Sequence, residues 1–304
     1  MTATAIPRFL QLPYQDSPVG LDIGLIGLPW DCGTTSSGRA RQGPVEIRRA
    51  GLGWKRRFHP TLQRSPLDLC RVGDLGDLEL SPFDREAALT DIEACIDRFV
   101  EHRTLLIALG GDHLVTLPIL RALGRAHPLG LVLFDAHPDV SDHSMGERLT
   151  ASTPFRRAVE EELLEPKRMV LIGIRGATNS RENLDWASEV GITIITMDDL
   201  YELGVDGAIG KVHETVGGHP AYVSFCIDGV DPAFAPGTGV RVPGGFSSYE
   251  AIRMVRKLHG LTLVGADIVE FSPPHDIDGL TANLALALTV ELIALLVRSL
   301  AAKA

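Results

Sequence analysis

Short apolar runs alternate with segments of helical periodicity along most of the chain. Runs of strand length, apolar and bounded by turn residues, predict strands at 21–27, within 68–80, and at 105–109, 129–134, 169–174, 192–196, 222–228 and 261–269. Apolar residues at helical spacing, with Pro or capping residues before them, predict helices at 44–50, 84–103, 116–125, 154–165, 180–190, 205–216, 247–258 and 280–300. This alternation is typical of an α/β fold with a doubly wound, mostly parallel sheet.

The segments between these elements indicate how the chain is organised. Residues 1–20 contain several prolines and show no periodicity, so we expect an irregular N-terminal arm. No interdomain linker and no internal repeat appears after it, so residues 1–304 are expected to form one domain. The polar loops at 30–43 and 140–152 follow buried strands, and loops in such positions commonly shape the mouth of a site.

Composition limits the class of protein without naming a function. Hydrophobic residues make up 45% of the chain and charged residues 22%, as in ordinary soluble proteins. The formal net charge of −10 argues against nucleic acid or an anionic membrane as partner and is compatible with a cationic substrate. The apolar stretch 284–300 is interrupted by polar residues and is therefore expected to be a packed helix. Four scattered cysteines and the lack of a signal sequence predict a cytoplasmic protein without disulfides.

The most informative stretch is the apolar run 129–134, which ends in Asp135-Ala136-His137-Pro138-Asp139. In extended chain alternate side chains point the same way, so Asp135, His137 and Asp139 share one side. Two carboxylates and an imidazole at a buried strand end repel one another and lose solvation, and a divalent ion makes the arrangement favourable. The alternative is a capping aspartate with a surface histidine, which explains only one of the three.

Three further polar residues follow other predicted strands: His113, Asp228 and Glu270. In doubly wound sheets ligands bind beyond the carboxyl ends of the strands, so these side chains are candidates for the same site as Asp135. Without such a context, a glutamate at a strand end is ordinary surface. The remaining conspicuous cations carry no motif and are expected to be solvated surface residues: Arg48, Arg49, His59, His102 and His127.

Several segments occur together in one order and resemble the ureohydrolase family, which includes arginase and agmatinase. The segments are Gly-Gly-Asp-His at 110–113, the cluster at 135–139, and the stretches 224–232, 236–239 and 269–273. The resemblance covers nearly the whole chain, and 153–158 and 237–245 look more like the agmatinase branch. It implies a three-layer α/β/α fold and trimers or hexamers. It also implies hydrolysis of a small guanidino compound to urea and an amine at a two-metal site, usually manganese.

The resemblance also implies roles for individual residues. His113, Asp135 and Asp139 match the ligands of one metal ion, and Asp135, His137 and Asp228 match those of the other, with Asp135 bridging. In this family a hydroxide that bridges the two ions attacks the guanidinium carbon. Asp139 would pass a proton to the leaving amine, and Glu270 would pair with the substrate guanidinium.

Two positions depart from the family pattern. Cys226 stands where a carboxylate normally bridges both ions. As a thiolate it would keep the negative charge and favour nickel, cobalt or zinc over manganese, whereas as a neutral thiol it would be a small buried hydrophobe. Ala151 replaces a histidine of the agmatinase branch. His143 in the same loop is a candidate substitute for proton transfer, although an isolated loop histidine is more often plain surface.

These departures leave more than one function open. The first hypothesis is a working hydrolase of a guanidino compound that is decarboxylated or otherwise unlike arginine. The second is a catalytically degenerate subunit that supports an active paralogue in a hetero-oligomer. A third is a hydrolase of another C–N bond, such as a deacetylase-like amidase, which Glu270 and the pairing of His113 with His137 disfavour.

Overall fold

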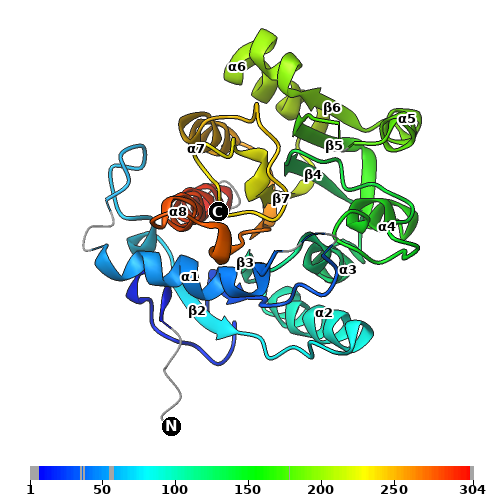
Figure 1. The fold of residues 1–304 in the computed structure, drawn as a ribbon. Coiled ribbons are helices and arrows are strands. Elements are labelled where there is room, and N and C mark those ends of the chain that lie inside the picture. The colour runs from blue at the N-terminus through cyan, green and yellow to red at the C-terminus, as the bar shows by residue number, and fades with distance from the viewer. Residues whose placement is uncertain (1–6, 35, 37, 55–57, 178, 302–304) are drawn as a thin grey trace.

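The computed structural model describes residues 7–34, 36, 38–54, 58–177 and 179–301. Its eight strands form one sheet in the order β2-β1-β3-β8-β7-β4-β5-β6, and every neighbouring pair is parallel (Figure 1). The strands are β1 (Ile23–Gly27), β2 (Val72–Asp77), β3 (Leu105–Leu109), β4 (Leu129–Phe134), β5 (Leu164–Ile174), β6 (Thr193–Thr196), β7 (Pro220–Cys226) and β8 (Thr262–Val269). The predicted parallel sheet is confirmed.

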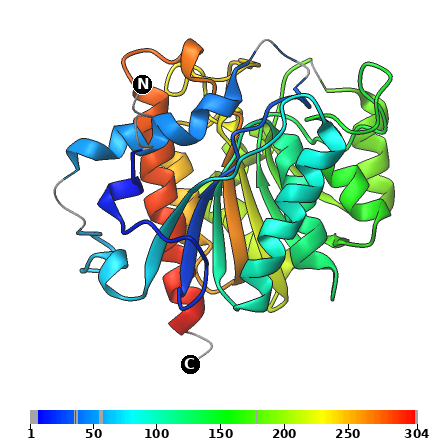
Figure 2. The ribbon, with the colours of Figure 1, turned by 90° about the horizontal axis from the view of Figure 1, so that it is seen from below.

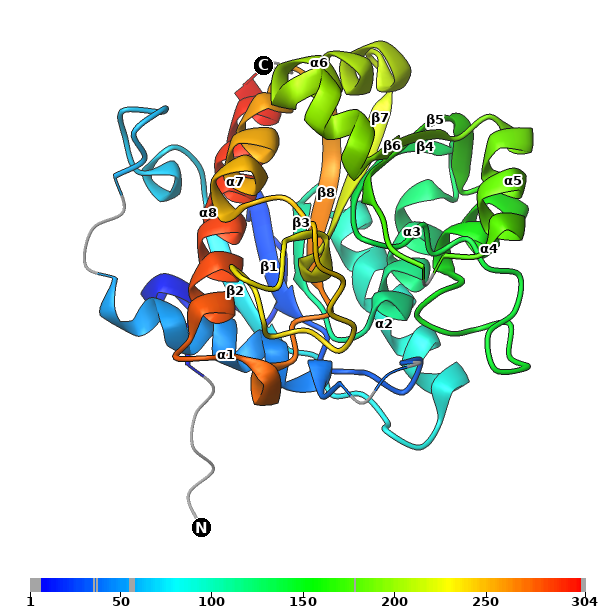
Figure 3. The ribbon, with the colours of Figure 1, turned by 45° about the horizontal axis from the view of Figure 1, so that its top comes forward.

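Helices cover both faces of the sheet, which confirms the three-layer α/β/α architecture (Figures 2 and 3). One face carries α1 (Gly43–Ala50), α6 (Met197–Val216), α7 (Ser248–Lys257) and α8 (Leu280–Ala301). The opposite face carries α2 (Arg85–Glu101), α3 (Thr116–Gly124), α4 (Pro154–Glu160) and α5 (Arg181–Val190).

Strand β4 shows why its sequence is apolar at every position. Val132 and Phe134 pack into the core beneath α6, α7 and α8, whereas Leu131 and Leu133 pack into the core beneath α2, α3 and α4. A strand buried on both faces cannot alternate apolar with polar residues. The strand therefore delivers the polar residues that follow it to the edge of the sheet, where the apolar layers end.

Helix α8 is, in the described part of the chain, the one helix long and apolar enough to cross a membrane by length and composition. In the fold, 78% of its most apolar window is buried, so the prediction of a packed helix is confirmed. The prediction that His59 lies at the surface was wrong. The His59 ring is buried, and its Nε2 atom lies 2.8 Å from Oε2 of Glu291 in α8. The expected surface positions of His102 and His127 are confirmed.

The expectation that Arg48 is solvated was wrong, whereas Arg49 is exposed as predicted. The Arg48 guanidinium is fully buried and donates two hydrogen bonds of 2.9 Å to the Asp74 carboxylate, as well as pairing with Asp77. Asp74 also accepts a 2.7 Å hydrogen bond from the backbone N–H of Phe9. This buried ion-pair network fastens the N-terminal arm to β2, because each charge satisfies several hydrogen-bonding groups at once.

Changing Arg48 to lysine should destabilise the fold although the charge is kept. A lysine ammonium lacks the planar fork of donors, so carboxylate oxygens of Asp74 and Asp77 would lose their partners. We expect the free energy of unfolding to fall by about 1–3 kcal/mol in denaturant titrations. Arg49→Lys on the exposed side of the same helix is the matched control and should change it by less than about 0.5 kcal/mol. Equal effects of the two substitutions would contradict the network.

Three element boundaries differ from the sequence-based expectation by five residues or more. Helix α4 ends at Glu160 and β5 begins at Leu164, five residues before the expected start, because polar residues open this strand. Helix α6 begins at Met197 and is interrupted at Gly204, which has φ +65°. The expected helix at 205–216 is its second part. The first part begins at a capping box between Thr196 and Asp199, a signal that apolar periodicity does not contain.

Candidate metal centre

The candidate site lies at the carboxyl ends of four neighbouring strands, β3, β8, β7 and β4 (Figure 1). His113 follows β3, Glu270 follows β8, Asp228 follows β7 and Asp135 follows β4. The chain leaves β3 for β4 and returns later to insert β7 and β8 between them. This topology creates the kind of crevice in which open α/β sheets bind ligands.

Asp135 is the centre of the cluster and is fully buried. Its Oδ2 atom lies 3.1 Å from Nδ1 of His113, and its Oδ1 atom lies 3.4 Å from Nδ1 of His137. The same His113 nitrogen is 2.8 Å from Oδ2 of Asp139, and the His137 nitrogen is 3.2 Å from Oδ2 of Asp228. The structure therefore brings together the two sets of residues that the sequence predicted, and both sets include Asp135.

A buried hydrogen-bond network behind the cluster fixes the His113 ring. Asp267 in β8 accepts hydrogen bonds from the hydroxyls of Ser224 (2.6 Å), Thr116 (2.7 Å) and Tyr222 (3.0 Å). Ser224 has one hydroxyl hydrogen, and with Asp267 ionised that hydrogen is used, so its oxygen accepts from Nε2 of His113 at 2.9 Å. A neutral His113 then carries its proton on Nε2 and presents the lone pair of Nδ1 to the carboxylates.

The orientation of His113 provides a test of whether a metal ion fits. Within the described chain, His113 Nδ1 and Asp135 Oδ2 are buried atoms without a hydrogen-bond partner, although they face each other. Burial lowers the pKa of His113, but the carboxylates of Asp135 and Asp139 outweigh this effect and raise it well above its usual range. A positive charge between these atoms, either a proton on Nδ1 or a divalent cation in its place, makes the approach favourable. Nitrogen and oxygen donors that converge in this way fit a divalent ion.

Charge within the cluster points to the same conclusion. Burial and the nearby Asp135 carboxylate raise the pKa of Asp139 to about 6 and also raise the pKa of Asp228. Burial alone would raise the pKa of Asp135 and lower that of His137. The His113 and His137 rings instead hold the pKa of Asp135 below its ordinary value, while Asp228 and Asp135 raise the pKa of His137 to about 12. The carboxylates therefore lie close enough to repel one another, and a positive charge between them reduces this repulsion.

Glu270 is held in an unusual backbone conformation beside the cluster. Its φ of +64° is uncommon for a residue other than glycine, and Asp139 has a similar φ of +47°. The Glu270 carboxylate accepts a 2.9 Å hydrogen bond from the backbone N–H of His113. Burial, together with the charges of Asp112 and Asp228, raises the pKa of Glu270 well above its usual range. A cationic group that enters the site would therefore stabilise this carboxylate in its ionised form.

The Gly-Gly-Asp-His segment brings the loop at 30–43 into the site. A Cβ atom on Gly111 would lie 1.8 Å from the carbonyl oxygen of Trp30, so only glycine permits this approach. The Asp112 carboxylate accepts hydrogen bonds from the backbone N–H groups of Gly33 (2.7 Å) and Leu114 (3.0 Å). Asp112 was not among the predicted site residues, and its role is to anchor this loop.

A cavity of about 300 Å³ opens above the cluster, within the range of sites for small molecules. Its inner wall includes His137, Asp139, Cys226, Asp228 and Glu270. The loops at 30–43 and 140–152 form much of the outer wall, as predicted. Their lining residues are Thr34, Ser36, Ser141, Ser144, Ala151 and Ser152. Sequence reasoning missed Asn179 and Asn183, which complete the outer wall from beyond β5, because no motif marks them.

The structure does not bring His143 into this cavity. The side chain is half exposed, its Nδ1 atom lies 2.9 Å from Oδ2 of Asp142, and it is absent from the described lining. The geometry therefore gives no support to His143 as a substitute for the histidine that Ala151 replaces. Sequence reasoning also missed Asp267, although a signal for it was present. An acidic residue inside an otherwise apolar strand indicates a buried polar partner.

Replacing Asp267 with asparagine should weaken metal binding without touching a ligand. The hydroxyls around it would rearrange, and His113 would lose the partner chain that holds its ring and tautomer. We expect affinity for divalent ions to fall by about 10-fold to 100-fold in competition with a chromophoric chelator. Ser224→Ala should act in the same direction, and the exposed Ser188→Ala should have no effect. Unchanged affinity in both buried variants would show that the network does not position His113.

The fold and the site together define an α/β enzyme with a candidate metal centre at the switch point of its sheet. The chain belongs to the arginase family, whose model matches residues 21–294. A guanidinopropionase of Pseudomonas aeruginosa is 48% identical over 300 residues, 98% of this chain and 94% of that protein. The mitochondrial agmatinase of Gallus gallus is 37% identical over 288 residues, 94% of this chain and 84% of that protein.

A solved structure agrees with this assignment. The proclavaminate amidino hydrolase of Streptomyces clavuligerus superposes with a TM-score of 0.92 at 38% identity, covering 97% of this chain and 98% of that chain. The predicted ureohydrolase family, on its agmatinase-like branch, is thereby confirmed, as is the predicted class of enzyme, a hydrolase of C–N bonds.

Proposed function

We propose that this chain hydrolyses the guanidino group of a short guanidino acid, releasing urea and the corresponding amine. The observation that carries the proposal is one cluster of six side chains, His113, Asp135, His137, Asp139, Asp228 and Glu270. His137, Asp139, Asp228 and Glu270 also line the cavity above it. Structural ion pairs do not require two imidazoles and four carboxylates to meet beneath a cavity of substrate size. A centre for two divalent ions with a guanidinium-binding carboxylate accounts for the whole set.

The residues divide into two groups around Asp135. His113, Asp135 and Asp139 would hold one ion, and Asp135, His137 and Asp228 the other. Bound there, the ions would lower the pKa of a water molecule and so supply the nucleophile at neutral pH. Manganese is the ion expected from the family, with nickel, cobalt or zinc as alternatives.

The protein's own groups would orient the substrate and move the proton. Glu270 lines the cavity, and its carboxylate would accept hydrogen bonds from the planar guanidinium and hold the carbon over the cluster. A water molecule that has already released one proton would add to this carbon, and the bond to the substituted nitrogen would break. The Asp139 carboxylate, on the His113 side of the cavity, would carry the remaining proton of that water to the departing nitrogen, so that urea and a neutral amine leave.

The outer wall of the cavity favours an acid over a diamine-like substrate. Ser141, Ser144 and Ser152 contribute hydroxyls, and Asn183 donates a 2.7 Å hydrogen bond to Ser141, which leaves the serine hydrogen free to point outward. No carboxylate is present among the described residues of this outer wall to pair with a terminal ammonium. Hydroxyl donors suit a carboxylate tail, and the names of the guanidinopropionase and the proclavaminate hydrolase refer to acids.

Urea release tests the proposal directly. The purified chain, loaded with manganese, nickel, cobalt or zinc, would be offered 3-guanidinopropionate, 4-guanidinobutyrate, agmatine and arginine. We expect a higher kcat/KM for the acids than for agmatine with at least one metal. A fully metallated homo-oligomer that releases no urea from any of these compounds would contradict a hydrolytic function. Faster turnover of agmatine would contradict the proposal that the substrate ends in a carboxylate.

A second candidate function is a degenerate subunit that supports an active paralogue. The observation that favours it is the presence of both departures, Cys226 and Ala151, in the lining of one cavity. It predicts co-purification with a paralogue from the native source and greater metal binding by a Cys226→Asp variant. A homo-oligomer that releases urea alone would refute it. Assembly into trimers or hexamers and a cytoplasmic location remain predictions, which light scattering and fractionation would test.

A further inference from the structure

We propose that Cys226 is a sulfur ligand that makes the two metal positions chemically different. At the softer position Cys226 joins His113 and Asp135, beside the Asp139 carboxylate. The harder position is formed by Asp135, His137 and Asp228. The inference rests on the metal centre of the proposed function but not on its substrate. It predicts a centre in which a thiophilic ion occupies one position and an ion that prefers oxygen occupies the other.

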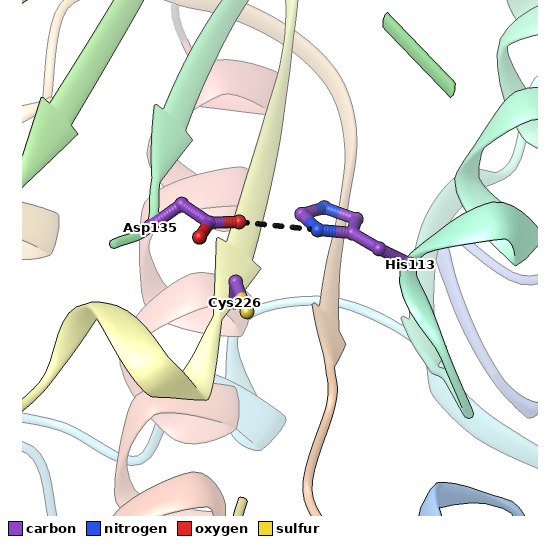
Figure 4. A group of neighbouring side chains, drawn as sticks. All are labelled: His113, Asp135 and Cys226. Atoms are coloured by element: carbon purple, nitrogen blue, oxygen red, sulfur yellow. Dashed lines mark ion pairs between the residues drawn. The ribbon is translucent and has the colours of Figure 1, made fainter. Parts of the chain in front are cut away.

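The geometry places the sulfur with the two unpartnered atoms. Ligand atoms of His113, Asp135 and Cys226 all lie within 4.8 Å of one another, a spacing that one ion can bridge. Figure 4 shows His113 and Asp135 facing each other, with Cys226 beside the line that joins them. His113 Nδ1 and Asp135 Oδ2, which have no hydrogen bond, point at this same space. The sulfur therefore completes a group of three donors.

The surroundings of Cys226 do not suit a plain hydrophobe. The side chain is 1% exposed at the end of β7. Its sulfur and a carboxylate oxygen of Asp135 lie within 4.8 Å of each other, and Cys226 lines the cavity together with Asp228 and Glu270. An apolar side chain among three carboxylates would exclude water from them without supplying a hydrogen bond or a positive charge. A cation changes this balance, because binding it displaces the thiol proton and leaves a thiolate among ligands.

The second position has a different character. The donors of Asp135, His137 and Asp228 are one nitrogen and carboxylate oxygens. Oxygen ligands suit manganese and magnesium, whereas thiolate selects zinc, cobalt, nickel or ferrous iron. Because Asp135 takes part in both positions, the ions would lie side by side while differing in preference.

Cobalt provides a readout that does not depend on activity. The holoprotein loaded with two cobalt ions should show near-ultraviolet thiolate-to-cobalt charge-transfer absorption. Cys226→Asp should bind the same number of ions without this band, and Cys226→Ser should also lack it. Cys95→Ser in α2, outside the described cavity lining, is the matched control and should keep the band. Two bound cobalt ions without the band in the unaltered chain would overturn the inference.

Competition between metals tests the difference between the two positions. With manganese in large excess over zinc, which offsets the greater affinity of zinc for nitrogen and oxygen ligands, the unaltered chain should retain zinc at the sulfur-containing position. Cys226→Asp should lower the bound zinc-to-manganese ratio by on the order of tenfold or more. An equal ratio in both proteins would overturn the inference. Urea release from the same samples separates the claims. If the charge-transfer band is present but no substrate yields urea, only the proposed function is contradicted. If urea is released and two cobalt ions are bound without the band, only the sulfur ligand is contradicted. If the chain binds no metal ion, both are contradicted.

Discussion

Replacing Asp135 with asparagine is expected to abolish loading with two metal ions and to lower urea release by about 10³-fold or more. Asp135 is the residue that both ligand groups share, and its two oxygens face different histidines. An amide offers one weak oxygen donor and no charge, so both positions would lose affinity together. A catalytic metal contributes several kcal/mol to transition-state stabilisation, and each 1.36 kcal/mol corresponds to tenfold in rate.

The measurement combines metal content after dialysis with the rate of urea release at saturating metal. Asp185→Asn, at an exposed position of α5, is the matched control and should keep both values. The Asp135 variant should remain folded, because the substitution preserves shape and removes a buried charge. A variant that retains two ions and near-normal turnover would show that Asp135 does not bridge them.

Replacing Glu270 with glutamine is expected to separate substrate binding from metal binding. The carboxylate lines the cavity and is placed to accept hydrogen bonds from a guanidinium, whereas it belongs to neither ligand group. Loss of one partner of a buried, hydrogen-bonded charge pair costs about 2–5 kcal/mol. This corresponds to a fall in kcat/KM of roughly 30-fold to 5,000-fold. Metal content should stay unchanged.

Glutamine keeps an acceptor for the backbone N–H of His113, so the local structure should be preserved. Glu189→Gln on the surface of α5 and His143→Ala in the exposed loop are the controls, and each should leave kcat/KM within about twofold, as surface changes usually do. Loss of metal from the Glu270 variant would assign this residue to the metal centre instead. A normal kcat/KM would remove its role in binding the guanidinium.

Much of the fold and of the candidate site could be predicted because both depend on local patterns. The apolar run before Asp135 is short and bounded by Pro128 and an acidic cluster, which indicates a strand buried on both faces. The same reasoning placed His113, Asp228 and Glu270 at strand ends. Residues 135–139 after it are not part of a strand, and Asp139 has a φ of +47°, so the tertiary structure brings their side chains together. Local patterns fail where the partner is distant in sequence, as with Arg48 and the Asp74 and Asp77 carboxylates of β2.

The type of each main element, the residues at the carboxyl ends of the strands and the family could all be inferred from the amino-acid sequence. The strand order became known only from the fold: β7 and β8 lie between β3 and β4, which brings the residues that follow these four strands into one cluster beneath the cavity. The fold also excluded His143 from that cavity and revealed that Asp267 acts through Ser224 on His113. The reason is physical: side-chain periodicity records which face of an element is buried, whereas strand order arises from pairing between segments far apart in the chain.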